Sequence, residues 1–139
     1  MEKHDADVVQ VLHDDGVDEV VINDMENLST TNIDKLIERL GPGSWAVRIV
    51  YNERFGGVII QQNPGEGNRL HYHPDADECW VIIVGTWEWY IEGKGTKIVS
   101  KNDIVVVEKT VKHKITCIGN ESGIRFAITK PDVDHVYVD

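Results

Sequence analysis

The chain has 139 residues, of which 41% are hydrophobic and 27% are charged, a composition typical of one soluble globular domain. Its 14 basic and 24 acidic residues leave a formal charge of −10. This charge argues against nucleic acid and anionic membrane as partners, because both attract basic surfaces. No apolar run reaches the roughly 18 residues of a membrane span, and the polar start lacks the apolar core of a signal peptide. We therefore expect a cytoplasmic protein whose two cysteines, Cys79 and Cys117, stay reduced.

The first third of the chain, residues 1–43, is acidic and contains one predicted short helix. Most of this segment is interpreted as a solvated arm, because acidic side chains outnumber basic ones throughout it. Apolar residues recur there at the three- and four-residue spacing of one helical face, at Ile33, Leu36, Ile37 and Leu40. Thr31 or Asn32 can cap the first N–H groups of this helix. Gly41 and Pro42 end it, because glycine accepts a left-handed backbone and proline cannot continue a helix.

From Ser44 onward, short runs rich in Val, Ile, Trp and Tyr are separated by turn residues, a pattern typical of β-strands. The predicted strands are Trp45–Tyr51, Gly57–Gln62, Arg69–His73, Glu78–Val84, Trp87–Glu92, Thr96–Val99, Asp103–Val107, His113–Ile118 and Ile124–Thr129. Many short strands at even spacing indicate an all-β fold, either an antiparallel barrel or a jelly roll. We predict a barrel over residues 44–130, followed by an edge strand or a tail over residues 131–139.

The residues that carry chemistry surround one predicted hairpin. His71 and His73 lie two positions apart on a strand, so their side chains share a face. A turn follows at Pro74, and a returning antiparallel strand would place the Glu78 carboxylate beside both imidazoles. His113 begins a strand expected on the far side of the barrel and can supply a third imidazole. Neutral imidazole nitrogens together with a carboxylate oxygen suit a divalent metal such as Fe, Mn, Zn or Ni.

These residues make the sequence resemble the cupin superfamily. The first cupin motif, G-x5-H-x-H-x4-E-x6-G, is matched without a spacing error at Gly65, His71, His73, Glu78 and Gly85. The second motif, G-x5-P-x-G-x2-H-x3-N, is matched only in part, with His113 in register. The sequence departs from this second motif at Asn102, Glu108, Thr110 and Cys117. The resemblance implies a small antiparallel β-barrel with one metal per chain, held inside by the three histidines and the glutamate.

Strand alternation predicts which further side chains share the interior with these ligands. Arg69 lies two residues before His71 and should face the same way. A guanidinium inside a barrel is costly unless it meets an anion. Arg69 therefore either binds an anionic group of a substrate or pairs with Glu66 or Asp77 at the rim.

The next strand presents two alternative faces to the pocket. Either Trp87 with Trp89 or Glu88 with Tyr90 lines the interior, and the other pair packs outside, where it can form a dimer surface. The same alternation places Trp80 beside the ligands. The predicted substrate-binding residues are Arg69, Arg48, Trp80, Trp89 and either Gln61 or its neighbour Gln62. The predicted catalytic bases are Glu78 and Tyr90.

The remaining histidines, His4, His13 and His135, lie in acidic or terminal segments and are not predicted to bind metal. The predicted function therefore follows from the one metal site. We expect a metal-dependent enzyme acting on a small polar molecule, which is anionic if an arginine binds it. A non-haem Fe(II) dioxygenase is preferred, because an apolar pocket around a histidine-rich site suits O2. The alternatives are a lyase, decarboxylase or isomerase using the same site, or a non-catalytic ligand-binding cupin. By analogy with other cupins, a homodimer is expected.

Overall fold

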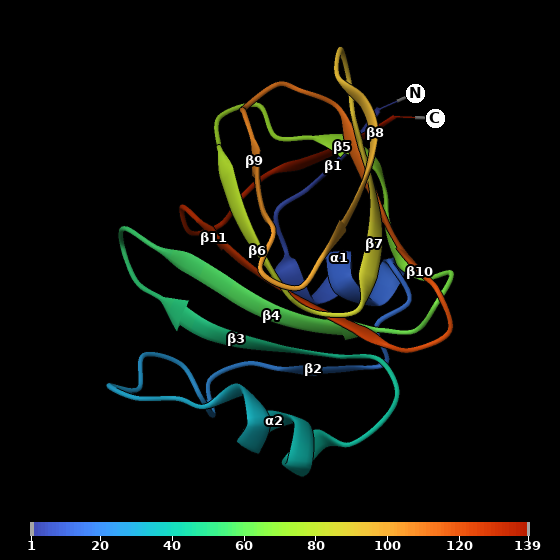
Figure 1. The fold of residues 1–139 in the computed structure, drawn as a ribbon. Coiled ribbons are helices and arrows are strands. Elements are labelled where there is room, and N and C mark those ends of the chain that lie inside the picture. The colour runs from blue at the N-terminus through green and yellow to red at the C-terminus, as the bar shows by residue number, and fades with distance from the viewer. Residues whose placement is uncertain (1, 139) are drawn as a thin grey trace.

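The structure is a computed structural model that describes residues 2–138 as two facing six-stranded sheets with two short helices (Figure 1). The elements in chain order are β1 (Glu2–Asp5), α1 (Val8–Asp14), β2 (Glu19–Val21), α2 (Ile33–Leu40), β3 (Trp45–Tyr51), β4 (Gly56–Gln62), β5 (Gly67–Tyr72), β6 (Glu78–Val84), β7 (Thr86–Ile91), β8 (Gly95–Ser100), β9 (Ile104–Val107), β10 (His113–Ile118), β11 (Gly123–Thr129) and β12 (His135–Val138). The first sheet has the order β1-β12-β5-β10-β7-β8, and the second has the order β2-β3-β4-β11-β6-β9. Neither helix of the described chain is long and apolar enough to cross a membrane.

The predicted all-β jelly roll is confirmed. Each predicted strand corresponds to one of the strands β3 to β11, and their ends differ by two residues at most. The predicted helix is α2. The Asn32 side chain caps it by accepting a hydrogen bond from the Lys35 backbone N–H at 3.1 Å. Gly41 ends it with a φ of 73°, in the region that favours glycine.

Residues 2–43 are tied to the barrel, so the interpretation of this segment as a solvated arm is wrong. Strand β1 pairs with β12, and β2 pairs with β3. A helix that the sequence analysis did not predict, α1, begins after Asp7, whose carboxylate accepts from the backbone N–H groups of Val9 and Gln10. Its residues Val11 and Leu12 are buried. Strand β12 is not an edge strand, because β1 covers its free side, and the two ends of the chain lie together (Figure 1).

The space between the sheets is filled by aromatic and branched side chains. Trp87 and Trp89 both point inward and are fully buried. Trp80 packs edge-to-face on Trp89, with 5.5 Å between their ring centroids. Glu88 and Tyr90 point outward from the same strand, and Tyr90 is 39% exposed. The prediction of Tyr90 as a base beside the metal is therefore wrong, because its side chain lies on the outer face of the sheet.

A second apolar cluster lies between the second sheet and α2. Its buried members are Leu36, Trp45, Val47, Ile59 and Ile124. Gln61 lies on this side of the sheet and donates through Nε2 to the carbonyl oxygens of Gly41 and Gly43, at 3.1 and 2.9 Å. The prediction of Gln61 as a substrate-binding residue is wrong, because it holds the turn after α2. Its neighbour Gln62 faces the barrel interior instead.

The turns of the second motif keep the conformation for which the motif uses glycine. Asn102 has a φ of 77° and Thr110 a φ of 70°. Asparagine tolerates the left-handed region, whereas a β-branched residue is strained there. The Thr110 N–H donates to the His73 carbonyl oxygen at 2.7 Å. The turn that leads into β10 is therefore preserved despite the departures from the motif, at a cost in backbone strain at Thr110.

We predict that Thr110→Gly raises the free energy of unfolding by about 1 kcal/mol, because it relieves left-handed strain at a β-branched residue. Urea unfolding followed by circular dichroism measures the change. Lys109→Gly is the matched control, since Lys109 is exposed and its φ is not positive. It should lower stability by up to about 1 kcal/mol. A Thr110→Gly variant no more stable than the wild type would contradict the prediction.

Candidate metal centre

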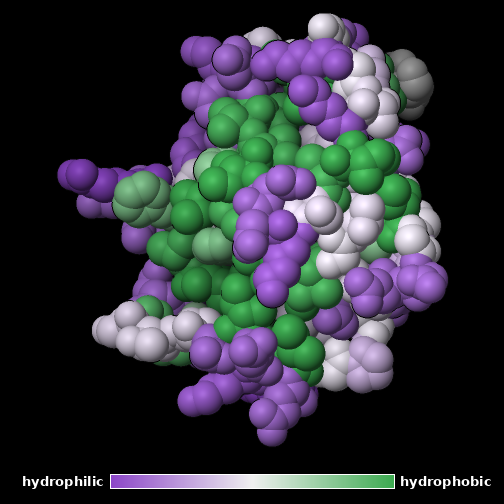
Figure 2. Space-filling view, viewed as in Figure 1, coloured by the Kyte–Doolittle hydropathy of each residue, from purple (hydrophilic) through white to green (hydrophobic). Residues whose placement is uncertain are grey.

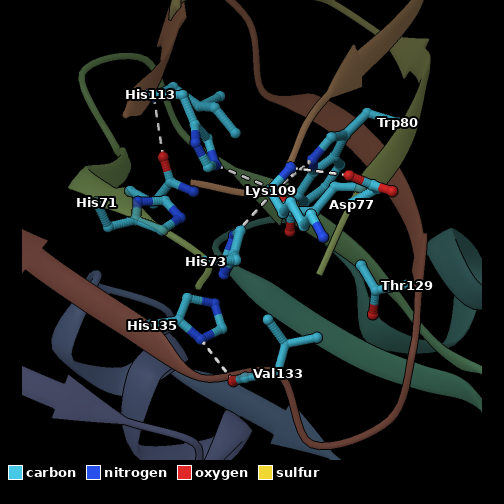
Figure 3. A network of polar contacts seen from close by, with 12 residues as sticks. His71, His73, Asp77, Trp80, Lys109, His113, Thr129, Val133 and His135 are labelled. Atoms are coloured by element: carbon cyan, nitrogen blue, oxygen red, sulfur yellow. Dashed lines mark hydrogen bonds and ion pairs between the residues drawn. The ribbon is translucent and has the colours of Figure 1, made fainter. Parts of the chain in front are cut away.

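The four predicted ligands come together in the barrel interior. His71, His73, Glu78 and His113 are all buried, and one ligand atom from each lies within 4.8 Å of the others. Figure 3 shows the three imidazoles turned toward one another in the middle of the barrel. The predicted convergence of these side chains is confirmed.

The route by which the backbone brings them together differs from the predicted hairpin. His71 and His113 are directly opposed on the neighbouring antiparallel strands β5 and β10, with 4.2 Å between their ring centroids. The prediction that His113 comes from the far side of the barrel is therefore wrong. Strands β5 and β6 belong to different sheets, so residues 73–77 cross from one sheet to the other. Glu78 thus faces the histidines from the opposite sheet.

Each of the three imidazoles is held by a hydrogen bond from its Nδ1 to a backbone carbonyl oxygen. His71 donates to Arg69 at 2.6 Å, and His113 donates to Val111 at 3.0 Å. His73 donates to Asp134 at 3.1 Å. Because a carbonyl only accepts, Nδ1 must carry the proton in each ring. This leaves Nε2 as the nitrogen that can bind a metal, as in protein sites where the second ring nitrogen is held by a carbonyl.

The Nε2 atoms meet one oxygen of Glu78. Oε1 lies 3.1 Å from Nε2 of His73 and 3.0 Å from Nε2 of His113. Within residues 2–138, Nε2 of His71 and of His73 has no hydrogen-bond partner of acceptable geometry. Lone pairs and a carboxylate facing one another need a cation between them. A divalent metal bound by three imidazoles and one carboxylate supplies that cation, so the residues present fit a metal.

The carboxylate is oriented and ionised by its surroundings. Trp80 donates from Nε1 to Oε1 of Glu78 at 3.2 Å. Burial opposes ionisation of Glu78, but the charge and hydrogen bonds of His73 and His113 hold its pKa well below the usual value. Burial, followed by the neighbouring His113, lowers the pKa of His71 well below its usual value. Burial also works against a proton on His73, yet Glu78 raises the pKa of that imidazole.

His135 packs against this cluster, although the sequence analysis assigned it no role. Its ring stacks on His71 at 5.3 Å and meets His73 edge-on at 4.6 Å between centroids. Its Nδ1 donates to the Val133 carbonyl oxygen at 3.0 Å (Figure 3), which leaves Nε2 free. Burial lowers the pKa of His135 to about 4. No local pattern marks this residue, because the pairing of β12 with β5 brings it to the cluster.

A cavity leads to the cluster between α1, β3, β4 and β11. Glu78, Trp80 and His135 line its inner part. Its water-accessible volume is about 100 Å³, and one water needs roughly 10–15 Å³ on a comparable measure. The cavity therefore has room for a small organic molecule next to the candidate ligands.

Two of the predicted substrate-binding residues line this cavity, Trp80 and Arg48. The Arg48 guanidinium pairs with Glu26 and lies 3.9 Å from the centroid of the Tyr51 ring. Trp89 does not line the cavity and is instead part of the core. The structure therefore leaves Trp80 and Arg48 as candidates for contact with a ligand.

Arg69 does not line the cavity either. Its Nε donates to the Asp15 carboxylate at 2.7 Å, and its guanidinium lies 3.9 Å from the centroid of the Tyr137 ring. This arrangement corresponds to the predicted rim pairing, with Asp15 in place of Glu66 or Asp77. Asp15 directly follows α1, so the ion pair fastens that helix to β5.

A further buried residue on the cavity wall, Arg125, escaped the sequence analysis. It lies on β11 and is 1% exposed. Its Nη2 donates to Oε1 of Gln62 at 2.8 Å. The only signal in the sequence is one arginine inside an otherwise apolar predicted strand, on the face that alternation turns inward.

We predict that His71→Ala and His113→Ala each reduce retained metal to below about a tenth of the wild-type amount while leaving the barrel folded. Each variant removes one Nε2 donor from the set. Elemental analysis and circular dichroism measure the two effects. His13→Ala on the exposed face of α1 and His135→Ala should both retain metal. Full occupancy in either ligand variant would contradict the assignment.

Metal affinity is predicted to fall by about tenfold per pH unit once the pH is below the ordinary histidine pKa of about 6.5, because Nε2 must be deprotonated to bind. The sign follows from His73, because Glu78 raises the pKa of that imidazole and a proton therefore competes with the metal more strongly as the pH falls. Titration with cobalt(II) at a series of pH values measures the effect. A metal affinity that stays constant from pH 5 to pH 8 would contradict this prediction.

Comparison with known proteins agrees with this site. The sequence of residues 58–129 matches the protein family described as Cupin domain, over about half of the chain. No curated protein matches. The comparison with solved structures, by contrast, finds many similar folds.

Three of these structures illustrate the likeness. A protein with a double-stranded beta-helix domain from Klebsiella pneumoniae is 17% identical, with a TM-score of 0.64 over 76% of this chain and 87% of that one. KdgF from Halomonas sp. is 17% identical, with a TM-score of 0.59 over 66% and 82%. Oxalate decarboxylase from Lactobacillus farciminis, in its formate complex, is 23% identical, with a TM-score of 0.54 over 59% and 26%. At these identities the likeness shows the fold. With the family match and the motif at the candidate metal centre, we conclude that the chain belongs to the cupin family.

Proposed function

We propose that this cupin is a metal-dependent enzyme that acts on a small polar molecule in the cavity beside His71, His73, Glu78 and His113. The observation that carries the proposal is that three Nε2 atoms and one carboxylate oxygen face one point next to a cavity. A buried cluster without a cavity would suit a purely structural metal equally well. When bound, a divalent metal supplies Lewis-acid polarisation of substrate oxygen atoms, and iron also supplies O2 activation.

A non-haem Fe(II) dioxygenase is the reaction class we favour. Its support is the apolar interior, in which Trp80 lines the cavity and packs in one buried core cluster with Ile82 and Ile115. Such an interior excludes water, and it strengthens the interactions of the few polar groups inside it. In this reaction the protein holds the four donor atoms rigidly and keeps the substrate in a cavity that excludes water.

A second candidate is a lyase, decarboxylase or isomerase reaction that moves a proton without O2. The specific observation in its favour is His135, which lines the cavity and is in contact with the rings of His71 and His73. Because Nδ1 of His135 donates to Val133, its Nε2 is free to accept a proton from a substrate. Glu78, the other predicted base, is committed to the histidines and Trp80.

We also propose a homodimer. The support is a group of exposed apolar side chains on one side of the molecule, and Figure 2 shows hydrophobic surface on the side where β6 and β9 lie. Ile104 is 65% exposed, Val106 is 58% exposed and Ile128 is 44% exposed. Soluble monomers rarely expose large contiguous apolar patches. This surface replaces the predicted outward aromatic pair as the candidate dimer face, because Trp87 and Trp89 are buried.

A cytoplasmic location is proposed on the chemistry of the cysteines. Cys79 is exposed and free, and Cys117 is buried and free. Free thiols persist where the compartment is reducing. The proposal therefore rests on two cysteines that are not joined by a disulfide bond.

Oxygen uptake separates the two reaction classes. Iron-loaded protein, offered a set of small organic acids, is predicted to consume O2 with one or more of them. The zinc-loaded protein and His113→Ala are predicted not to. Turnover at equal rates under nitrogen, lost in His135→Ala, would instead establish the proton-transfer class. Ligand binding without turnover under either condition would establish a non-catalytic binding cupin.

A further inference from the structure

Arg125 carries a positive charge into the barrel interior with too few partners for its N–H groups. Its side chain is 1% exposed. Nη2 donates to Gln62, but Nε and Nη1 have no hydrogen-bond partner anywhere in the described chain. Burial lowers the pKa of Arg125 to about 10, so the group stays protonated at neutral pH. Unpaired buried N–H groups on a cation are destabilising, because they have lost their hydrogen bonds to water.

Two tryptophan rings hold the guanidinium in place without using its N–H groups. The Cζ atom lies 4.5 Å from the ring centroid of Trp80 and 5.2 Å from that of Trp87. Cation–π contacts stabilise the charge through the ring faces. They leave the in-plane N–H groups of Arg125 available, so the tryptophans position the arginine rather than satisfy it.

The two carboxylates whose charge acts on Arg125 have other hydrogen-bond donors. Asp15 and Glu78 are the acids that act on its charge. Asp15 accepts from Arg69 at 2.7 Å, and Glu78 accepts from Trp80 at 3.2 Å within the histidine cluster. Neither of them is hydrogen-bonded to Arg125, so no carboxylate of the described chain pairs with its Nε or Nη1.

Arg125 borders the cavity that also contacts the candidate metal centre. Arg125, Trp80 and Glu78 all line the same cavity. Trp80 contacts Arg125 through its ring face and Glu78 through its Nε1. One indole therefore lies between the guanidinium and Glu78, and all three side chains border the same cavity.

We propose that Arg125 binds a carboxylate of a small organic acid whose other oxygen atoms face the His71, His73, Glu78 and His113 cluster. Guanidinium N–H groups pair well with planar carboxylates. The inference rests on the proposed function for the oxygen atoms of the acid that face the metal cluster. The contact of its carboxylate with Arg125 does not require a metal. It also moves the anion-binding role that the sequence suggested for Arg69 to a residue of β11.

Thermal unfolding of the full chain in chelator, with and without added acid, tests this proposal. The probes are oxalate, malonate and succinate, with their neutral diamides and inorganic phosphate as controls. At least one acid should raise the unfolding temperature of the metal-free protein, since a ligand that binds the folded state stabilises it. The matching diamide and phosphate should raise it less.

Variants assign the effect to Arg125. Arg125→Met should weaken binding of the acid at least tenfold and leave the unfolding temperature without ligand unchanged or higher, because it removes an unpaired buried charge. Arg125→Lys keeps the charge but not the planar group, and it should also weaken binding at least tenfold. Arg69→Met, at a partly buried arginine that does not line the cavity, should keep the response.

The outcomes separate this proposal from the proposed function. His113→Ala, predicted to lose metal, should still respond to the acid through Arg125. Failure of the wild type to bind metal would therefore end the proposed function and leave the carboxylate site standing. Equal responses of wild type and Arg125→Lys, equal responses to acid and diamide, or no response to any acid would overturn the carboxylate site.

Discussion

The site depends on three hydrogen bonds from imidazole to backbone. Each Nδ1 proton of His71, His73 and His113 is held by a carbonyl oxygen, so each ring presents Nε2 to the same point as the Glu78 carboxylate. Without these bonds the rings could turn or change tautomer, and the donors would no longer converge. The cost of gathering lone pairs and a carboxylate in a dry interior is offset only by a cation.

The carbonyl groups that hold the three imidazoles differ in how far along the chain they lie from their histidines. His71 and His113 use carbonyls two residues upstream, which a strand places nearby at no further cost. His73 uses Asp134, which lies 61 residues away, just before β12. Strand β12 is paired with β1 on one side and with β5 on the other. The two chain ends therefore take part in building the site, and His135 reaches the cluster by the same route.

The alternation of buried and exposed residues along strands predicted much of this structure. It located β3 to β11, placed His71 and His73 on one face, and turned Trp80 inward. It failed where position depends on which strands pair. The sequence alone does not show that β5 and β6 lie in different sheets, that β10 adjoins β5, or that Asp15 reaches Arg69. Gln61 was misplaced by one residue, which reverses the face of a strand, and Arg125 belongs to a strand that was predicted but not considered for charge.

The barrel interior thus combines a set of donors that needs a cation with an arginine that needs an anion, at two places along one cavity. Anomalous X-ray scattering from a crystal of the metal-loaded protein tests the first of these directly. The account predicts one peak, roughly 2.0–2.2 Å from Nε2 of His71, His73 and His113 and from a Glu78 oxygen. A peak next to Nδ1 of these histidines, or peaks only at other residues, would contradict the proposed metal centre.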